Sequence, residues 1–317
     1  MISTTTPTAT LYVAGNINVD LIMGTLDQWP QRGTEVMVKN SELRPGGSAG
    51  NCALALEAMQ VRHRAIANQG DDGLSQWLAG YFPHSAAYWP RSQSETSLTV
   101  GVTHSDHERS FISNYGHIVQ LTAQQVLEQL PEQAAAGDIV LLCGTFLCLH
   151  LYDEYLALLC ELRLRGYLIA VDTGWPPQGW TDQVKQDISR WLPQCDWLLL
   201  NEVETLGLGA AASLDASAMQ LTLQLSGRGG CVVKCGEQGA RCWLQDRSLS
   251  QPAQPVRVVD TIGAGDSFNA GFLTALLHQQ DIAQALQWGI AVAALAISTA
   301  PRRYPTWQQL QSSAKEQ

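Results

Sequence analysis

A glycine-rich turn with two aspartates stands near the end of the chain, where residues 258–272 read VVDTIGAGDSFNAGF. The turn follows the strand-like run VRVVD and opens a run that is typical of a helix. Because Gly263, Ala264 and Gly265 have small side chains or none, the backbone N–H groups at the start of the helix are accessible and converge on one point. The turn therefore predicts an anion-binding site, which the helix dipole also favours.

Asp266 lies in the first turn of this expected helix and has two interpretations. A carboxylate there can cap the helix and stabilise it by about 0.5–2 kcal/mol. Alternatively, it can accept a proton from a hydroxyl group that attacks a phosphoryl group held by the amides of residues 263–266. The pairing of a base with an anion hole favours this second interpretation.

The composition limits the classes of partner. The chain has 317 residues, a hydrophobic fraction of 45% and a formal net charge of -10, which predicts one large domain spanning 1–317 and no broad surface for nucleic acid or anionic membrane. A small anionic ligand needs only a local site. The eight cysteines sit mostly in apolar runs, and the first residues, MISTTTPTAT, do not resemble a signal peptide, so we expect reduced thiols and a cytoplasmic protein.

The elements that position the turn form an alternating pattern. From residue 138 onward, apolar strand-like runs such as IVLLCGTF, YLIAVDTG, DWLLLN and CVVKCG alternate with helical patterns, one of them near 202–226. Such runs are typical of parallel strands buried on both faces. The fold class expected is α/β, with a doubly wound, mostly parallel sheet flanked by helices.

A second group of strands has a different pattern. The stretch EVMVKN reads as extended, and TSLTVGVTH and RSFISN alternate apolar and polar residues around a polar turn, as in a hairpin with one solvated face. These segments do not suit a sheet buried on both faces. We expect them to form a small β-sheet lid from about residues 16–44 and 95–118.

The stretch DTIGAGDSFNAGF resembles the C-terminal signature of the ribokinase-like (PfkB) carbohydrate kinase family. The segments GNINVD, PGGSAGN, the lid hairpin, NEVE at 201–204 and VVKCGEQGA at 232–240 occur in the family's order. The resemblance covers nearly the whole chain. It implies ATP-dependent phosphorylation of a sugar-like alcohol, with Asp266 as the base and the amides of Gly263, Ala264, Gly265 and Asp266 as the anion hole.

The resemblance also implies an acceptor site. Its residues would be Asn16, Asp20, Gly46, Gly47 and Asn51. A carboxylate such as Asp20 can accept two hydrogen bonds from vicinal hydroxyl groups, and an amide such as Asn51 both donates and accepts. The alternatives are that the asparagines satisfy backbone groups in turns or caps and that the glycines form a plain turn before a helix.

Residues for the nucleotide and for cations follow from the same resemblance. Lys234, Gly236, Gly239, Thr261, Gly263 and Gly265 would contact ATP, and Asn201 and Glu204 would hold Mg²⁺ through water. Asp172 would lie near the metal or cap a helix, and Lys234 can also be an ordinary strand-end lysine. A potassium ion would take ligands from Asp260 and the Ile262 carbonyl. Arg109 would reach a substrate phosphate or pair with a nearby acid.

Some positions depart from the family pattern. Ser48 replaces the lysine that a ribokinase carries after the paired glycines, and the strand LLCGTF lacks an acid for ribose. The acceptor therefore stays open among ketoses, aldoses, sugar acids, phosphosugars and nucleosides. Ile290 stands where relatives often have a polar residue near adenine, and Gln60 stands where a helix-ending glycine is common. The family habit also predicts a homodimer through the lid strands.

Four rival functions can be compared with this one. Residues 207–212, GLGAAA, imitate the G-x-G-x-x-A fingerprint of dinucleotide-binding oxidoreductases, but the segment NEVETL separates them from the preceding strand. No G-x-x-x-x-G-K-[ST] motif is present, which excludes a Walker-type NTPase. A nucleoside kinase of the same fold and a non-catalytic sugar-binding relative are the remaining alternatives.

Overall fold

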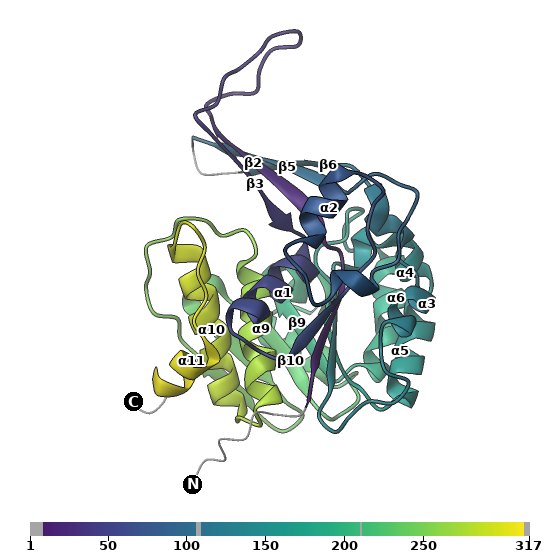
Figure 1. Ribbon diagram of the computed structural model, residues 1–317. Helices are drawn as coiled ribbons and strands as arrows, with labels where there is room; N and C mark the ends of the chain where they lie inside the picture. Colours follow the sequence, from purple (N-terminus) through teal and green to yellow (C-terminus); the bar gives the residue numbers. More distant parts are fainter. Residues whose placement is uncertain (1–8, 106–108, 210, 314–317) are drawn as a thin grey trace.

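The computed structural model describes residues 9–105, 109–209 and 211–313. Residues 106–108, within the expected lid hairpin, and Ala210, within the glycine-rich segment at 207–212, lie outside this description. Figure 1 shows a large sheet between two layers of helices, with a smaller sheet at one end of the molecule.

The large sheet has eight strands in the order β12-β11-β10-β9-β8-β7-β1-β4. The strands from β10 to β4 are parallel, whereas β11 and β12 are antiparallel additions at one edge. This confirms the predicted mostly parallel sheet. The strands are β1 (Leu11–Gly15), β4 (His63–Ile66), β7 (Ile139–Cys143), β8 (Leu168–Asp172), β9 (Trp197–Asn201), β10 (Gly230–Lys234), β11 (Ala240–Trp243) and β12 (Ser248–Gln251).

Helices cover both faces of this sheet because its strands are apolar on both faces. Leu11 and Val13 of β1 pack into one buried cluster, and Tyr12 and Ala14 pack into the other. One layer contains α1 (Ser48–Ala58), α2 (Gly73–Ala79), α9 (Ala264–Leu277), α10 (Ile282–Ser298) and α11 (Trp307–Ser313). The other contains α3 (Ala123–Glu128), α4 (Leu149–Asp153), α5 (Tyr155–Leu164), α6 (Asp182–Trp191), α7 (Glu202–Gly209) and α8 (Leu214–Thr222).

The small sheet has four strands in the order β3-β2-β5-β6. They are β2 (Asn18–Leu26), β3 (Asn40–Gly46), β5 (Leu98–His104) and β6 (Arg109–Ser113), and all four lie close to the predicted lid segments. The expectation that EVMVKN is a strand was wrong for most of its length, because β3 begins only at Asn40. The preceding residues belong to the connection 27–39, which projects away from the body in Figure 1.

The helical stretch at 202–226 and the residue Gln60 can now be compared with what the sequence predicted. The helical stretch expected near 202–226 is two helices, α7 and α8, with a break after Gly209. Gly207 and Gly209 therefore lie inside a helix rather than in a strand-to-helix turn, which removes the basis of the dinucleotide fingerprint. Gln60, two residues beyond α1, has a φ of 60°, so its backbone is in the left-handed region that glycine usually occupies.

The carboxyl edge of the large sheet brings several polar residues together. Asp172 ends β8, Asn201 ends β9 and Lys234 ends β10, with Lys234 and Asn201 in register. The N-terminal ends of α1 and α9 lie at the same edge, beneath the small sheet (Figure 1). Ligands of open α/β sheets bind beyond this edge. Within the described residues, none of the helices is both long enough and apolar enough to cross a membrane.

Candidate active site

The glycine-rich turn begins α9 as the sequence predicted. Gly263 is the N-cap residue with a φ of 74° and a ψ of 12°, and none of the described side chains caps the helix. The Ala264 N–H donates to the Thr261 carbonyl at 3.2 Å, so it belongs to the turn rather than to the anion hole. The N–H groups of Gly265 and Asp266 have no partner within the helix, because the first residues of any helix lack one. Together with the Gly263 N–H, they can receive an anion.

Asp266 in the first turn of α9 is held by a residue of another helix. The Asn51 Nδ2 of α1 donates to the Asp266 Oδ2 at 3.0 Å, which leaves Oδ1 for another partner. Burial and the neighbouring Asp172 carboxylate raise the pKa of Asp266 to about 7, although the Asn51 bond and Lys234 act in the opposite direction. A carboxylate with such a pKa is suited to accept a proton near neutral pH.

Lys234 links the end of β10 to the start of α9. Its Nζ donates to the Asp172 Oδ2 at 2.7 Å and lies 3.3 Å from the position that a Cβ at residue 265 would take. Burial would lower the pKa of Lys234, but Asp172 and Glu204 outweigh it and raise the pKa, so the ammonium is charged. The Asn269 Nδ2 also donates to the Asp172 Oδ2, at 2.6 Å. Lys234 therefore places a positive charge beside the turn, and the hydrogen bond to Asp172 holds the Lys234 side chain in that position.

The proposed acceptor side centres on Asp20 of β2. Its carboxylate is buried and accepts a 2.8 Å hydrogen bond from the Asn18 Nδ2, and burial raises its pKa to about 6 despite the nearby Arg44. A Cβ at residue 46 would collide with this carboxylate, which explains why the position is glycine. Gly47, with a φ of 83°, is the N-cap residue of α1. Asp20 and Asn51 thus flank the start of α1.

Asn16 makes one hydrogen bond with each polar atom of its amide group. Its Oδ1 accepts the Ser48 N–H at 3.2 Å, and its Nδ2 donates to the Asn18 Oδ1 at 3.3 Å. These contacts fit the alternative that Asn16 caps backbone groups at the start of α1. Asn18 was missed by the sequence reasoning, although the alternation in N-x-N-x-D places Asn16, Asn18 and Asp20 on one face of the chain.

The residues expected to hold Mg²⁺ make a reciprocal cap at the start of α7. The Glu204 Oε2 accepts the Asn201 N–H and the Asn201 Oδ1 accepts the Glu204 N–H, both at 2.8 Å. Glu204 is buried, and burial followed by Asp172 raises its pKa. Asp172, Glu204 and Asp266 therefore repel one another with Lys234 as their common countercharge. Three carboxylates with one lysine between them fit a divalent cation that is bound through water. The Glu204 Oε1 would contact that water, because Oε2 already accepts the Asn201 N–H.

Asp260 is surrounded by arginines. It lies in an irregular segment after β12, which ends at Gln251, so the expectation of a strand at VRVVD was wrong. Arg44 of β3 and Arg109 of β6 reach it at 2.7 and 3.0 Å, and Arg302 reaches it at 3.2 Å. Arg302 also donates to the Ile262 carbonyl at 2.6 Å. The two groups expected to bind potassium thus bind a guanidinium group instead, so they do not fit a potassium ion in this structure. Arg109 also donates to Thr261 Oγ1 at 2.9 Å, and its ion pair with Asp260 corresponds to the expected alternative as a partner of a nearby acid.

The remaining expected nucleotide residues lie around the β10–β11 connection and on α10. Gly236 and Gly239 flank a single turn of 3-10 helix, Gly236–Gln238, just beyond the end of β10. Thr261 is exposed, one residue beyond Asp260. Ile290 of α10 packs against the hydrophobic core and is partly buried, so it offers an apolar side chain and no polar contact.

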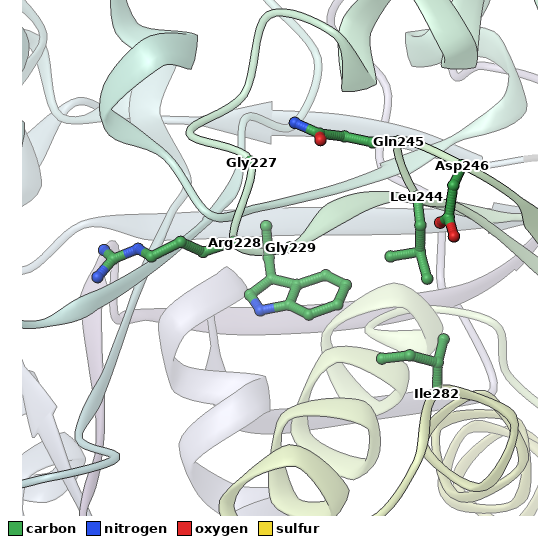
Figure 2. A pocket seen from close by; sticks show the side chains of 8 residues that line it. Gly227, Arg228, Gly229, Leu244, Gln245, Asp246 and Ile282 are labelled. Atoms are coloured by element: carbon green, nitrogen blue, oxygen red, sulfur yellow. The ribbon is translucent and has the colours of Figure 1, made fainter.

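A separate hollow of about 370 Å³ lies at the opposite edge of the sheet. Figure 2 shows its lining, which includes Arg228, Gly229, Leu244 and Ile282. Trp197 in this lining is the first residue of β9, and Gly229 precedes β10, whereas the turn at Gly263 lies beyond the carboxyl ends of these strands. The hollow is therefore distant from Asp266 and does not belong to the site.

Several site residues were missed by the sequence reasoning. Asn269 follows Asp266 by three residues, a spacing that places both on one face of α9 and could have identified it. Arg44 and Arg302 are distant from the turn in sequence, and no local pattern connects them with Asp260. Their convergence depends on how the small sheet and the segment after α10 fold onto the body.

The fold and the site together define an α/β protein of the ribokinase-like class, with a small sheet over a ligand site at the carboxyl edge of a larger sheet. Residues 8–308 match the model of the pfkB family carbohydrate kinases, so the chain belongs to that family and is a carbohydrate kinase. It is 24% identical to the ribokinase of Bacillus subtilis over 288 residues, covering 90% of this chain and 92% of the relative.

Two further comparisons extend this result. The chain is 26% identical to the ATP-dependent ribose-1-phosphate kinase of Halopiger xanaduensis, covering 89% of this chain and 90% of the relative. Among solved structures, it is similar to the Arabidopsis thaliana ribokinase complexed with ribose and ATP, with a TM-score of 0.75, 20% identity and coverage of 97% of this chain and 98% of the other. This structural likeness confirms the ribokinase-like fold.

Proposed function

We propose that the protein transfers the γ-phosphoryl group of ATP to a hydroxymethyl or other alcohol group of a sugar or sugar-like acceptor. The observation that carries the proposal is the position of Asp266 in the first turn of α9, with a pKa raised to about 7 and one carboxylate oxygen held by Asn51. The base and the uncapped amides of the turn lie within one helical turn of each other. A base and an anion hole this close suit phosphoryl transfer.

In the proposed mechanism, Asp266 Oδ1 accepts the proton of the acceptor hydroxyl. The hydroxyl oxygen then forms a bond to the γ-phosphorus, and the bond between that phosphorus and the β,γ-bridging oxygen breaks, releasing ADP. The N–H groups of Gly263, Gly265 and Asp266 stabilise the negative charge on the transferred group. Lys234 adds a positive charge next to the same turn.

The acceptor would bind between β2 and α1. The Oδ1 of Asp20 accepts a hydrogen bond from Asn18, so its Oδ2 would accept one from a sugar hydroxyl group. Gly46, which lacks a Cβ atom, leaves room for the Asp20 carboxylate. Asn51 would contact both the acceptor and the base. Arg109 would serve the acceptor only if it exchanged its present contacts with Asp260 and Thr261.

The nucleotide would lie along the β10–β11 connection and the turn before α9. Gly236 and Gly239 have no side chain to obstruct the nucleotide, Lys234 lies beside the turn that would form the anion hole, and Thr261 would contact the nucleotide at the start of that turn. Mg²⁺ would accompany ATP, held through water by Glu204, with Asn201 fixing that carboxylate; it would neutralise charge on the phosphates. No step is assigned to potassium.

The remaining features of the proposal concern the whole molecule. We infer one kinase domain over the full chain and a cytoplasmic setting, supported by eight cysteines that are all unpaired. A second copy would pack on the small sheet, where Leu43, Phe111 and Ile112 are 42, 55 and 59% exposed. Sedimentation of the wild type against Phe111→Glu would test the dimer, which the variant should dissociate.

A coupled ADP-release screen tests the function directly. The purified chain is incubated with ATP, Mg²⁺ and representative ketoses, aldoses, sugar acids, phosphosugars and nucleosides, and ³¹P NMR identifies the phosphorylated product. A nucleoside as the best acceptor would support the nucleoside-kinase alternative. Sugar binding without ATP consumption for any acceptor would contradict the proposal in favour of a non-catalytic relative.

A further inference from the structure

The carboxylate of Asp260 is fully engaged by protein groups. Its Oδ1 accepts the Ile262 N–H at 2.9 Å and lies 3.0 Å from the Arg109 Nη2 in an ion pair, and its Oδ2 accepts Arg44 at 2.7 Å and Arg302 at 3.2 Å. Each carboxylate oxygen has about two good acceptor directions. Three guanidinium groups and one N–H therefore occupy the positions around the two oxygens that a metal ion would need.

The Nη2 of Arg302 contacts both groups that were expected to bind potassium, Asp260 and the Ile262 carbonyl. Its Nη2 donates to the Ile262 carbonyl at 2.6 Å, as well as to Asp260. Its Nη1 lies 3.0 Å from the position that a Cβ at residue 263 would take. The guanidinium group is thus placed directly beneath the turn that begins α9, between the two oxygens that would otherwise coordinate a monovalent cation.

The contact with Ile262 fixes the direction of a neighbouring N–H group. A trans peptide is planar, with its C=O and N–H pointing in opposite directions. The Ile262 carbonyl and the Gly263 N–H belong to one such peptide. Because the carbonyl accepts from Arg302, the Gly263 N–H points away from the guanidinium group. A charge-assisted hydrogen bond holds this orientation.

The charge of Arg302 also reaches the reacting carboxylates. It is among the groups that lower the pKa of Asp266 and of Asp20, although burial is the larger influence on both and raises them. Around Asp260, three guanidinium groups face one partly buried carboxylate, so the surroundings already carry an excess of positive charge. A further cation at this point would be repelled.

We propose that Arg302 is a built-in replacement for a monovalent cation, a positioning residue that holds the Ile262 carbonyl and aims the Gly263 N–H into the anion hole. The inference rests on the proposed phosphotransfer at this turn. It follows that the enzyme works without potassium. It also follows that removing the guanidinium group creates a cavity, lined by Asp260 and the Ile262 carbonyl, that a small cation can enter.

The test compares the wild type with Arg302→Ala, Arg302→Lys and Arg303→Ala. Arg303 is the adjacent arginine, and its side chain is exposed, which makes Arg303→Ala a matched control. Turnover is measured with the tris salt of ATP in choline, sodium and potassium chloride at one ionic strength. We expect the wild type and Arg303→Ala to vary less than about twofold among the three salts, and Arg302→Ala to lose at least about tenfold in kcat in choline.

Rescue distinguishes a missing cation from a damaged fold. In Arg302→Ala, potassium chloride or millimolar guanidinium chloride should restore at least half of the lost activity, and Arg302→Lys should retain more activity than the alanine variant. Activation of the wild type by potassium of tenfold or more would overturn the inference. Failure of both cations to rescue a folded Arg302→Ala protein would also overturn it.

Thermal unfolding supplies a readout that does not need turnover. Potassium, relative to choline, should raise the Tm of Arg302→Ala by several degrees and leave the Tm of the wild type unchanged. An equal response of both proteins would contradict the inference. If no acceptor were phosphorylated by the wild type, the proposed function would fail, and the melting experiment would still decide whether Arg302 fills the cation position.

Discussion

The Asn51 Nδ2 donates a 3.0 Å hydrogen bond to the Asp266 Oδ2, and this bond joins the first turns of α1 and α9. Asn51 therefore contacts Asp266, whereas Asn16, between β1 and β2, accepts the Ser48 N–H at the start of α1. The bond favours the ionised form of Asp266 and opposes the effect of its burial. Asn51, which would contact the acceptor, thus also lowers the pKa of Asp266.

Replacing Asp266 by asparagine should lower kcat by at least two orders of magnitude, a loss of about 2.7 kcal/mol or more in transition-state stabilisation. Asparagine keeps the size of the side chain and cannot accept the proton. Steady-state kinetics with the best acceptor measure the loss, and calorimetry with ATP serves as the control, because nucleotide affinity should change less than threefold. A variant that keeps a tenth or more of the wild-type kcat would refute the role of Asp266 as base.

The same variant should have a distinctive stability profile. Because the pKa of Asp266 is raised in the folded state, its carboxyl group contributes most to stability below its ordinary value of 3.8 and loses that contribution as the pH rises through about 7. The Tm of Asp266→Asn relative to the wild type should therefore increase between pH 4 and pH 7.5. Scanning calorimetry measures this difference, and a constant difference across the range would contradict the raised pKa.

The pH dependence of turnover should follow the same group. In the wild type, kcat should fall as the pH drops through about 7, because the base becomes protonated. In Asn51→Leu, the loss of the bond to Oδ2 should move the midpoint upward by about one pH unit. The pH–rate profiles of the two proteins measure the shift. Identical midpoints would show that Asn51 does not tune Asp266.

Asp20→Asn should weaken acceptor binding selectively. A hydrogen bond to a charged group contributes about 1.5–3 kcal/mol, so the KM for the acceptor at pH 8 should rise at least tenfold, while the KM for ATP should change less than twofold. Since the pKa of Asp20 is raised to about 6, the wild-type acceptor KM should increase below that pH, and the variant should lose this dependence. Equal effects on both substrates would place Asp20 outside the acceptor site.

Gln60→Gly should stabilise the protein. The backbone of Gln60 has a φ of 60°, which costs a residue with a Cβ atom about 1 kcal/mol, and glycine adopts it without strain. The gain is reduced by the greater freedom of glycine in the unfolded chain. We expect a net increase of about 0.5 kcal/mol in the free energy of unfolding, measured by urea titration. A decrease would show that the Gln60 side chain contributes contacts of its own.

Much of the fold could be predicted because its signals are local. The buried strands and the helices between them follow from apolar runs and from periodicity, and the turn at Gly263 follows from its composition. The start of β3 was misplaced because EVMVKN has strand-forming residues, yet no partner strand lies beside residues 35–39. Strand pairing is a non-local property, and the sequence pattern of one strand does not contain it.

The residues of the candidate site also divide into those with a local sequence signal and those without one. Asp266, Gly263 and Lys234 were identified from short motifs and from a resemblance, and the structure brings them together. Asn269 was accessible from helical spacing. The arginines on Asp260 were not, because Arg44 and Arg302 are separated from it by 216 and 42 residues, respectively. The two oxygens expected to bind potassium do contact one common group, but that group is the guanidinium of Arg302, which comes from a distant segment.

The ion pairs of Asp260 with Arg44 and Arg109 have a mechanical consequence. Arg44 lies on β3 and Arg109 on β6, which are the two outer strands of the small sheet, whereas Asp260 belongs to the loop that leads into α9. Both outer strands of the small sheet therefore form an ion pair with the same side chain of the main body, Asp260. Lifting the sheet as a rigid body would break both ion pairs at once, so access to the proposed acceptor site would depend on Asp260, six residues before Asp266.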